Sequence, residues 1–143
     1  MQEASIEEAL ELMLKKDPRY TREAYFFVRE ALDYTQKTIG KDHRGVIRHV
    51  SGQELLAGIR GYALSQFGPM AMTVLEEWGI RACEDFGEIV FNMVEFGVLA
   101  KTEKDSRADF AGGYEFHEAF RKPYLPSQRA AKPGPTPAST SRN

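Results

Sequence analysis

The cysteine and the histidines are the side chains of this chain best suited to catalysis or metal binding, and they are few. Cys83 has no second cysteine to pair with, and His43, His49 and His117 form no HExxH motif. A metal site needs several such ligands at positions that converge. The sequence therefore predicts no metal site and no disulfide.

Phosphate-binding loops are also missing from the sequence. Neither GxxxxGKS/T nor GxGxxG occurs, and no pair of acidic residues is set apart in an apolar pocket. We therefore predict no cofactor and no enzymatic activity. A catalytic site around His43 or His117 is the least favoured of three interpretations.

A polar, basic connector at residues 40–50 is the first candidate binding site. Its only acidic residue is Asp42, and loops on a rigid scaffold commonly carry binding functions. No aromatic residue is interleaved, so the pattern is a weak indication of nucleic-acid binding. The candidate contacts in this connector are Lys41, His43, Arg44, Arg48 and His49.

An acidic helix expected at about residues 83–96 is the second candidate surface. Between Pro69 and Gly97 the chain has six acidic residues and one basic residue, Arg81, for a net charge of −5. Such a face would repel the phosphates of duplex DNA but could contact a basic protein. The candidates are Glu84, Glu88, Phe91 and Phe96, together with Phe26, which like Phe91 and Phe96 lies off the apolar stripes.

Five helices are expected to position these candidates, at about residues 5–17, 21–40, 51–68, 69–79 and 83–96. Apolar residues recur at helical spacing in each range, most regularly in the fifth. Ser51 and Glu54 form a capping box at the start of the third helix. Gly58 and Gly61 lie inside that helix, where glycine is unfavourable, and predict a close contact with another part of the chain.

After the fifth helix the apolar period changes from 3.6 to 2, which is typical of strands. Residues 98–102 predict a short strand and residues 104–107 a turn. Tyr114, Phe116 and Phe120 then resemble the inward residues of a returning strand. The predicted fold class is mainly α with a C-terminal β-hairpin, an α+β fold.

A helix pair followed by a two-stranded ribbon resembles the winged-helix arrangement. The wing would lie at about residues 98–120, and the acidic helix at 83–96 would be the second helix of the pair. An unclassified small α+β domain fits the same order of elements. The acidic charge argues against this helix as a reader of the major groove in either case.

The length of 143 residues, the 42% apolar content and the net charge of −2 are those of one globular domain, expected at residues 1–125. Residues 126–143 contain four prolines and no aromatic residue, so we expect a disordered basic tail. No apolar run approaches the ~18–20 residues that span a membrane. With one cysteine and no secretory signal, the expected location is cytoplasmic.

Six runs of sequence carry a resemblance to a protein family: KDPRY, AYFFV, HVSGQELLAGIR, QFGPMAMTVLEEWGI, EDFGEIVFNMVEFG and DFAGGYEFHEAF. From Asp17 to Pro123 the chain resembles a small family of bacterial proteins of about this length to which no activity is assigned. The resemblance implies a bacterial, cytoplasmic, stand-alone domain and identifies no site residues.

Protein binding is the function that these observations favour. We expect a non-enzymatic adaptor module that contacts another protein, with a homodimer left open by the off-stripe aromatic residues. The alternative is a nucleic-acid- or ribosome-associated factor that uses the connector 41–49, the wing with Lys101, Lys104 and Arg107, and the basic tail. Binding of that kind would weaken steeply with salt.

Overall fold

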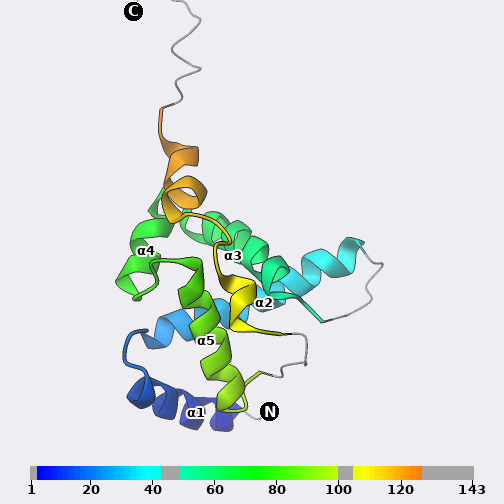
Figure 1. The fold of residues 1–143 in the computed structure, drawn as a ribbon, viewed down its shortest axis with the longest axis vertical. Helices are drawn as coiled ribbons and strands as arrows, with labels where there is room; N and C mark the ends of the chain where they lie inside the picture. Colours follow the sequence, from blue (N-terminus) through cyan, green and yellow to red (C-terminus); the bar gives the residue numbers. More distant parts are fainter. Residues whose placement is uncertain (1–2, 43–48, 100–104, 127–143) are drawn as a thin grey trace, which may run out of the picture.

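Five α-helices make up most of the computed structural model, which describes residues 3–42, 49–99 and 105–126 (Figure 1). The five helices predicted from the sequence are confirmed, with ends that differ by a few residues. They are α1 (Glu3–Lys16), α2 (Arg22–Asp42), α3 (Gly52–Phe67), α4 (Ala71–Glu77) and α5 (Cys83–Glu95). Short turns complete the fold: the 3-10 helices η1 (Gly68–Met70), η2 (Arg107–Phe110) and η4 (Lys122–Tyr124), and the π-helical turn η3 (His117–Arg121).

Side chains close to the helix ends fix where α3 and α5 begin. The predicted capping box of α3 is confirmed: the Glu54 amide donates to Ser51 Oγ at 3.1 Å, and the Ser51 amide donates to Glu54 Oε1 at 3.0 Å. At α5, the backbone amides of Arg81 and Ala82 donate to Asp85 Oδ2 at 2.8 and 3.1 Å. Each carboxylate satisfies amides that have no partner within the helix.

The close approach of α2 and α3 explains one of the two glycines inside α3. A Cβ atom built on Gly58 would lie 1.7 Å from Thr35 Oγ1 and 2.8 Å from Thr35 Cβ. Thr35 is buried, and its hydroxyl donates to the Ala31 carbonyl oxygen at 2.7 Å, which holds the side chain against α3. The contact predicted for Gly58 is therefore confirmed, and it is made by a side chain of α2.

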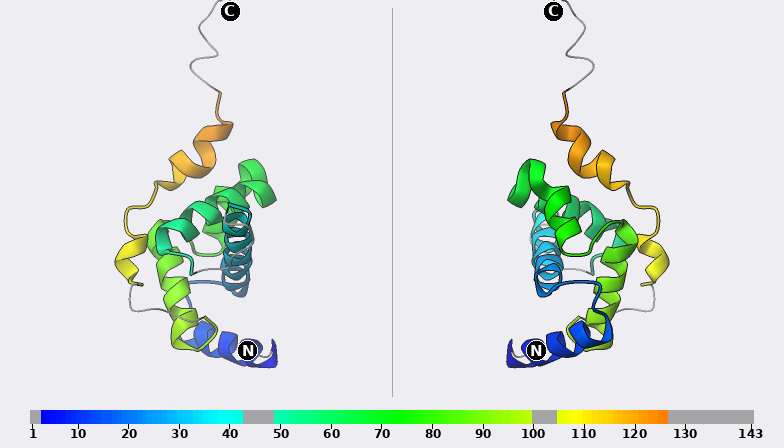
Figure 2. Two further views of the ribbon diagram at one scale, coloured as in Figure 1. Left: turned by 90° about the vertical axis from the view of Figure 1, so that its right-hand side faces the viewer. Right: turned by 90° about the vertical axis from the view of Figure 1, so that its left-hand side faces the viewer.

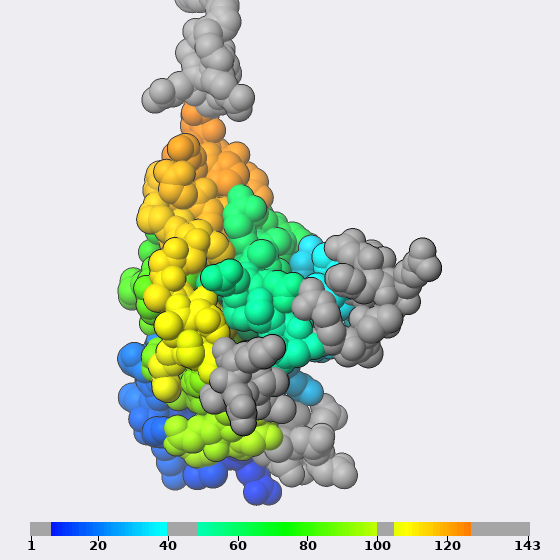
Figure 3. All heavy atoms as spheres, turned by 45° about the vertical axis from the view of Figure 1, so that its right-hand side comes forward, coloured from blue at the N-terminus to red at the C-terminus, as the bar shows by residue number. Residues whose placement is uncertain are grey.

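The molecule is elongated, with α1 at one end and η3–η4 at the other (Figure 2). Between them, α2, α3 and α5 surround a continuous core to which α1, α4 and the C-terminal segment contribute. Residues 105–113 lie alongside the first half of α3 (Figure 3). The largest fully buried side chains are Tyr20, Phe86, Phe120, Leu10, Met13, Ile59, Leu75, Ile80, Ile89 and Met93.

The predicted C-terminal β-hairpin is wrong, because the interpretable part of the chain contains no β-strand. The amides of Val98 and Leu99 donate to the Met93 carbonyl oxygen at 2.8 and 3.2 Å, which closes the end of α5 instead of starting a strand. The expected returning strand is the turn η3. The fold class is therefore helical, and no wing follows α5 in the ranges described.

The spacing of buried residues explains this error. Phe116, Ala119 and Phe120 are buried at positions i, i+3 and i+4, which is the helical period. The rings of Phe116 and Phe120 pack edge to face with centroids 5.0 Å apart. Tyr114, Phe116 and Phe120 would share one face of a strand, but Glu118 on that face is exposed and Ala119 on the opposite face is buried.

The five α-helices are the elements whose length and composition bear on membrane insertion. In the ranges that the structure covers, none of them combines the length and the apolar character that a bilayer-crossing segment requires.

Candidate functional site

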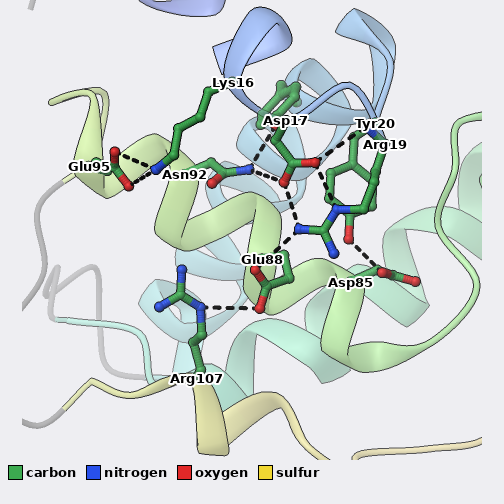
Figure 4. Close-up of polar contacts among 10 residues, drawn as sticks. Lys16, Asp17, Arg19, Tyr20, Asp85, Glu88, Asn92, Glu95 and Arg107 are labelled. Atoms are coloured by element: carbon green, nitrogen blue, oxygen red, sulfur yellow. Dashed lines mark hydrogen bonds and ion pairs between the residues drawn. The ribbon is translucent and has the colours of Figure 1, made fainter. Parts of the chain in front are cut away.

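The acidic face of α5 is bound by cations of the same chain (Figure 4). Glu88 Oε1 accepts from Arg19 Nη2 at 3.4 Å, and Glu88 Oε2 accepts from Arg107 Nε at 3.1 Å. Glu95 pairs with Lys16, and Glu84 Oε2 accepts from the Gly112 amide at 3.2 Å. These internal contacts use much of the charge that a basic partner would need.

Basic side chains of the same chain also lie over the rings of the candidate residues Phe91 and Phe96. The Arg107 guanidinium lies 5.1 Å from the ring centroid of Phe91, and Lys16 Nζ lies 5.8 Å from that of Phe96. Both rings are half-buried. The predicted role of this helix face in partner binding stays a prediction, and the surface it offers is more neutral than its sequence indicates.

A buried polar cluster joins the turn between α1 and α2 to α5. Asn92 Nδ2 donates to Asp17 Oδ2 at 2.9 Å and to the Tyr25 hydroxyl oxygen at 3.0 Å. The hydrogen bonds from the Arg19 guanidinium lower the pKa of Asp17 to about 2. The Tyr20 hydroxyl donates to Asp85 Oδ1 at 2.5 Å. Sequence analysis missed this cluster, although an asparagine inside the apolar stripe of α5 was a usable signal.

A pocket between α2, α3, α5 and η2 is the best-formed cavity near the candidate residues, with a volume of about 310 Å³. We call it the α2–α3–α5 pocket. Its apolar walls come from Leu32, Val50, Leu55, Val90, Phe91, Val94, Leu99 and Phe110. Val90 and Val94 belong to the apolar stripe of α5 and are half-buried, because this part of the stripe faces the pocket.

Polar groups of the pocket are already held in internal contacts. His49 Nε2 lies 2.8 Å from Asp105 Oδ1, and Asp109 Oδ2 accepts from the Ser106 amide at 3.0 Å. Ser51 Oγ caps α3, and no hydrogen bond joins it to His49 among the residues with described side chains. Ser51, His49 and Asp105 are the residue types of a serine hydrolase triad, but the hydrogen bond from serine to histidine that activates the serine is missing among the residues with described side chains.

Most of the basic connector lies outside the described residues. This holds for His43, Arg44 and Arg48 and for the side chain of Lys41, while His49 is described and lines the pocket. Of the basic residues in the alternative interpretation, Arg107 contacts Glu88, and Lys101, Lys104 and the tail beyond Pro126 are outside the described ranges. Nucleic-acid binding therefore stays a prediction.

Cys83 is buried and hydrogen-bonded, which does not suit a nucleophile. Its Sγ donates to the Tyr114 carbonyl oxygen at 3.3 Å and accepts from the Tyr114 amide at the same distance. Burial raises the pKa of the thiol, and the reactive species is the thiolate. Among the residues that the structure describes, no group of three or more potential ligands is placed to hold a metal ion.

Comparisons of the chain with protein-family models, with curated proteins and with solved structures found no match, so the resemblance to a bacterial family stays a prediction.

Proposed function

We propose that this chain is a binding domain without enzymatic activity, and that the α2–α3–α5 pocket receives an apolar side chain of a partner protein. One observation carries the proposal: a cavity of about 310 Å³ whose apolar walls come mainly from three helices and η2. Pockets that accept one large apolar or aromatic anchor dominate the binding energy of many protein interfaces.

The size and lining of the pocket support a side-chain anchor. Its volume lies at the lower end of the roughly 300–1,000 Å³ typical of small-molecule sites. The polar groups of His49, Ser51, Asp105 and Asp109 accompany the apolar walls. An apolar centre with polar groups around it is the common anatomy of a protein interface.

The arrangement of titratable groups supports binding over catalysis. Asp109 caps η2, and His49 is paired with Asp105. Cys83 is buried outside the pocket lining. Nucleophilic catalysis requires a nucleophile hydrogen-bonded to its base, and among the residues with described side chains the Ser51 hydroxyl caps α3 and makes no hydrogen bond to His49.

Selection from a random peptide library displayed on phage tests the proposal, with the full-length chain as bait and affinities then measured by calorimetry. We expect the selected peptides to share one large apolar residue. Val94→Trp, which fills the pocket from a half-buried position of α5, should weaken their binding about tenfold or more. Leu12→Trp adds the same side chain at an exposed position of α1 outside the pocket and should leave binding unchanged.

Two results would contradict the proposal. Peptides that bind the wild-type chain and Val94→Trp equally well would place the binding site elsewhere. A selection that yields no peptides with a shared apolar residue would show that the pocket does not receive an apolar side chain of a partner protein. Thermal melts of both variants establish that each is folded at the temperature of the assay.

A further inference from the structure

A second concave site lies between the first half of α2, the second half of α3 and the end of α4, and it shares no lining residue with the α2–α3–α5 pocket. We call it the aromatic pit. Its volume is about 210 Å³. Its lining residues are Phe26, Phe27, Tyr62, Phe67, Trp78, Glu23, Glu30 and Gln66.

Four of the five aromatic rings that line the pit form one contacting group around Phe27. Phe27 is buried, and its ring centroid lies 5.5 Å from that of Tyr62, 5.8 Å from that of Phe67 and 5.6 Å from that of Trp78. The other three rings are half-buried. Phe67 and Trp78 meet at an interplanar angle of 80°. The half-buried rings therefore surround Phe27 and leave part of their π systems accessible.

Two carboxylates on α2 accompany these rings. Glu23, Phe27 and Glu30 are at positions i, i+4 and i+7, so they lie on one face of the helix. Glu30 Oε1 accepts from the Tyr62 hydroxyl at 3.2 Å. Glu23 is exposed and has no hydrogen bond or ion pair among the described residues. The pit thus combines aromatic faces with negative charge, which is the combination that attracts an organic cation.

Elsewhere in this fold, cations of the same chain lie over such rings. Lys16 lies over Phe96, Arg19 over Tyr20 and Arg107 over Phe91, each within 5.8 Å of the ring centroid. Among the described residues, no cation of the chain lies over a ring of the pit. The charge and the ring faces there are therefore left for a cation from another molecule.

We propose that the aromatic pit binds an arginine side chain of a partner protein. A guanidinium group stacks on aromatic faces and at the same time directs several N–H donors at carboxylates. Glu23 and Glu30 are about 10 Å apart along the helix axis, on either side of Phe27. A guanidinium against the half-buried rings that surround Phe27 would lie between the two negative charges.

The single tryptophan of the chain, Trp78, reports directly on this site. The test titrates the full-length chain with a blocked peptide, acetyl-Gly-Ser-Arg-Ser-Gly-amide, and follows both Trp78 emission and its one indole N–H resonance. The same peptide with citrulline in place of arginine keeps the shape and removes the charge. We expect a saturable change with the arginine peptide and about tenfold weaker binding of the citrulline peptide.

Matched charge removals separate the pit from general electrostatics. Glu23→Gln with Glu30→Gln should weaken binding of the arginine peptide about threefold per charge. Glu8→Gln with Glu11→Gln removes the same charge from exposed positions of α1 outside the pit and should leave the affinity unchanged. All four positions are exposed, so the variants are expected to fold.

Three outcomes would overturn the proposal: no response of Trp78 to the arginine peptide, equal responses to arginine and citrulline, or tighter binding of the corresponding lysine peptide. Pocket variants such as Val94→Trp do not touch the pit. Failure of the apolar-anchor proposal and failure of this one are therefore seen in different variants.

Discussion

The side-chain amide of Asn92 donates a hydrogen bond to the carboxylate of Asp17 across 2.9 Å, joining residues 75 positions apart in the sequence. Both side chains are buried. Arg19 binds the same carboxylate from the other side, with Nε and Nη2 each 2.7 Å from an oxygen (Figure 4). This pair fixes the turn between α1 and α2 against the middle of α5.

Removal of the Asn92 amide should destabilise the fold. Asn92→Leu leaves the Asp17 carboxylate and the Tyr25 hydroxyl each without one partner, at an expected cost of about 1–3 kcal/mol in the free energy of unfolding. Urea denaturation measures this cost. In a chain that already carries Asp17→Asn, Asn92→Leu should lower the free energy of unfolding by less, because no buried charge is then left without a hydrogen-bond partner. Additive costs in the double-mutant cycle would contradict this coupling.

Stability should fall at acidic pH through Asp17. Hydrogen bonds from Arg19 are the main cause that lowers the pKa of Asp17 from 3.8 to about 2. The unfolded chain therefore binds the proton more readily, so the contribution is complete above about pH 4 and is lost as pH falls towards 2. It amounts to about 2 kcal/mol. Urea midpoints between pH 2 and 6 measure it.

The control for this pH dependence is a carboxylate that makes no hydrogen bond or ion pair with any described residue. Asp17→Asn should flatten the acidic limb of the stability curve. Asp33→Asn, at an exposed position of α2, should keep the limb of the wild-type chain. Parallel curves for the wild-type chain and Asp17→Asn would show that Asp17 is not the group responsible.

The two glycines within α3 should respond to alanine in opposite directions. The Cβ of Gly58→Ala would clash with Thr35 and separate α2 from α3, with an expected loss of about 1–3 kcal/mol. A Cβ on Gly61 would lie 3.5 Å from the nearest atom of Tyr34, so Gly61→Ala should gain up to about 1 kcal/mol from helix propensity. Thermal melts that shift in the same direction would contradict the packing of α2 on α3.

Reversal of charge at Glu88 should affect the stability of the fold. Glu88→Lys would set a third cation beside Arg19 and Arg107, and we expect a loss on the order of 1 kcal/mol that diminishes with salt. Glu77→Lys, at an exposed position of α4 without a hydrogen-bonding or ionic partner in the described part of the chain, is the matched control. Equal urea midpoints for the two variants would contradict a role of Glu88 in holding these arginines.

The thiol of Cys83 should be unreactive in the folded chain. It is buried, and burial raises its pKa, so little thiolate is exposed to a reagent at neutral pH. Labelling with a chromogenic disulfide reagent should be slow in buffer and fast in urea. Rapid labelling without denaturant would show that the C-terminal segment around Tyr114 opens readily.

The sequence by itself determined the positions of the five helices and the cap of α3. These features depend on contacts within one element: the 3.6-residue apolar period, and Ser51 with Glu54 three residues later. The close contact at Gly58 could also be predicted, because glycine inside a helix is unfavourable unless a close approach of another segment requires it. The conformation of the C-terminal segment could not be predicted, since Tyr114, Phe116 and Phe120 suit either a strand or a helical turn. Burial of these residues against α3, α4 and α5 selects the turn.

Only the tertiary structure decided which side chains from different helices meet. Asp17 and Asn92 are each ordinary polar residues in the sequence, and the packing of α5 against the turn between α1 and α2 places one against the other. The same holds for Phe27 of α2, Tyr62 of α3 and Trp78 directly after α4, which meet in the aromatic pit. Contacts of this kind depend on the angles and distances at which helices pack. The ridges and grooves of whole helix surfaces set those angles and distances, so no local sequence pattern encodes the contacts.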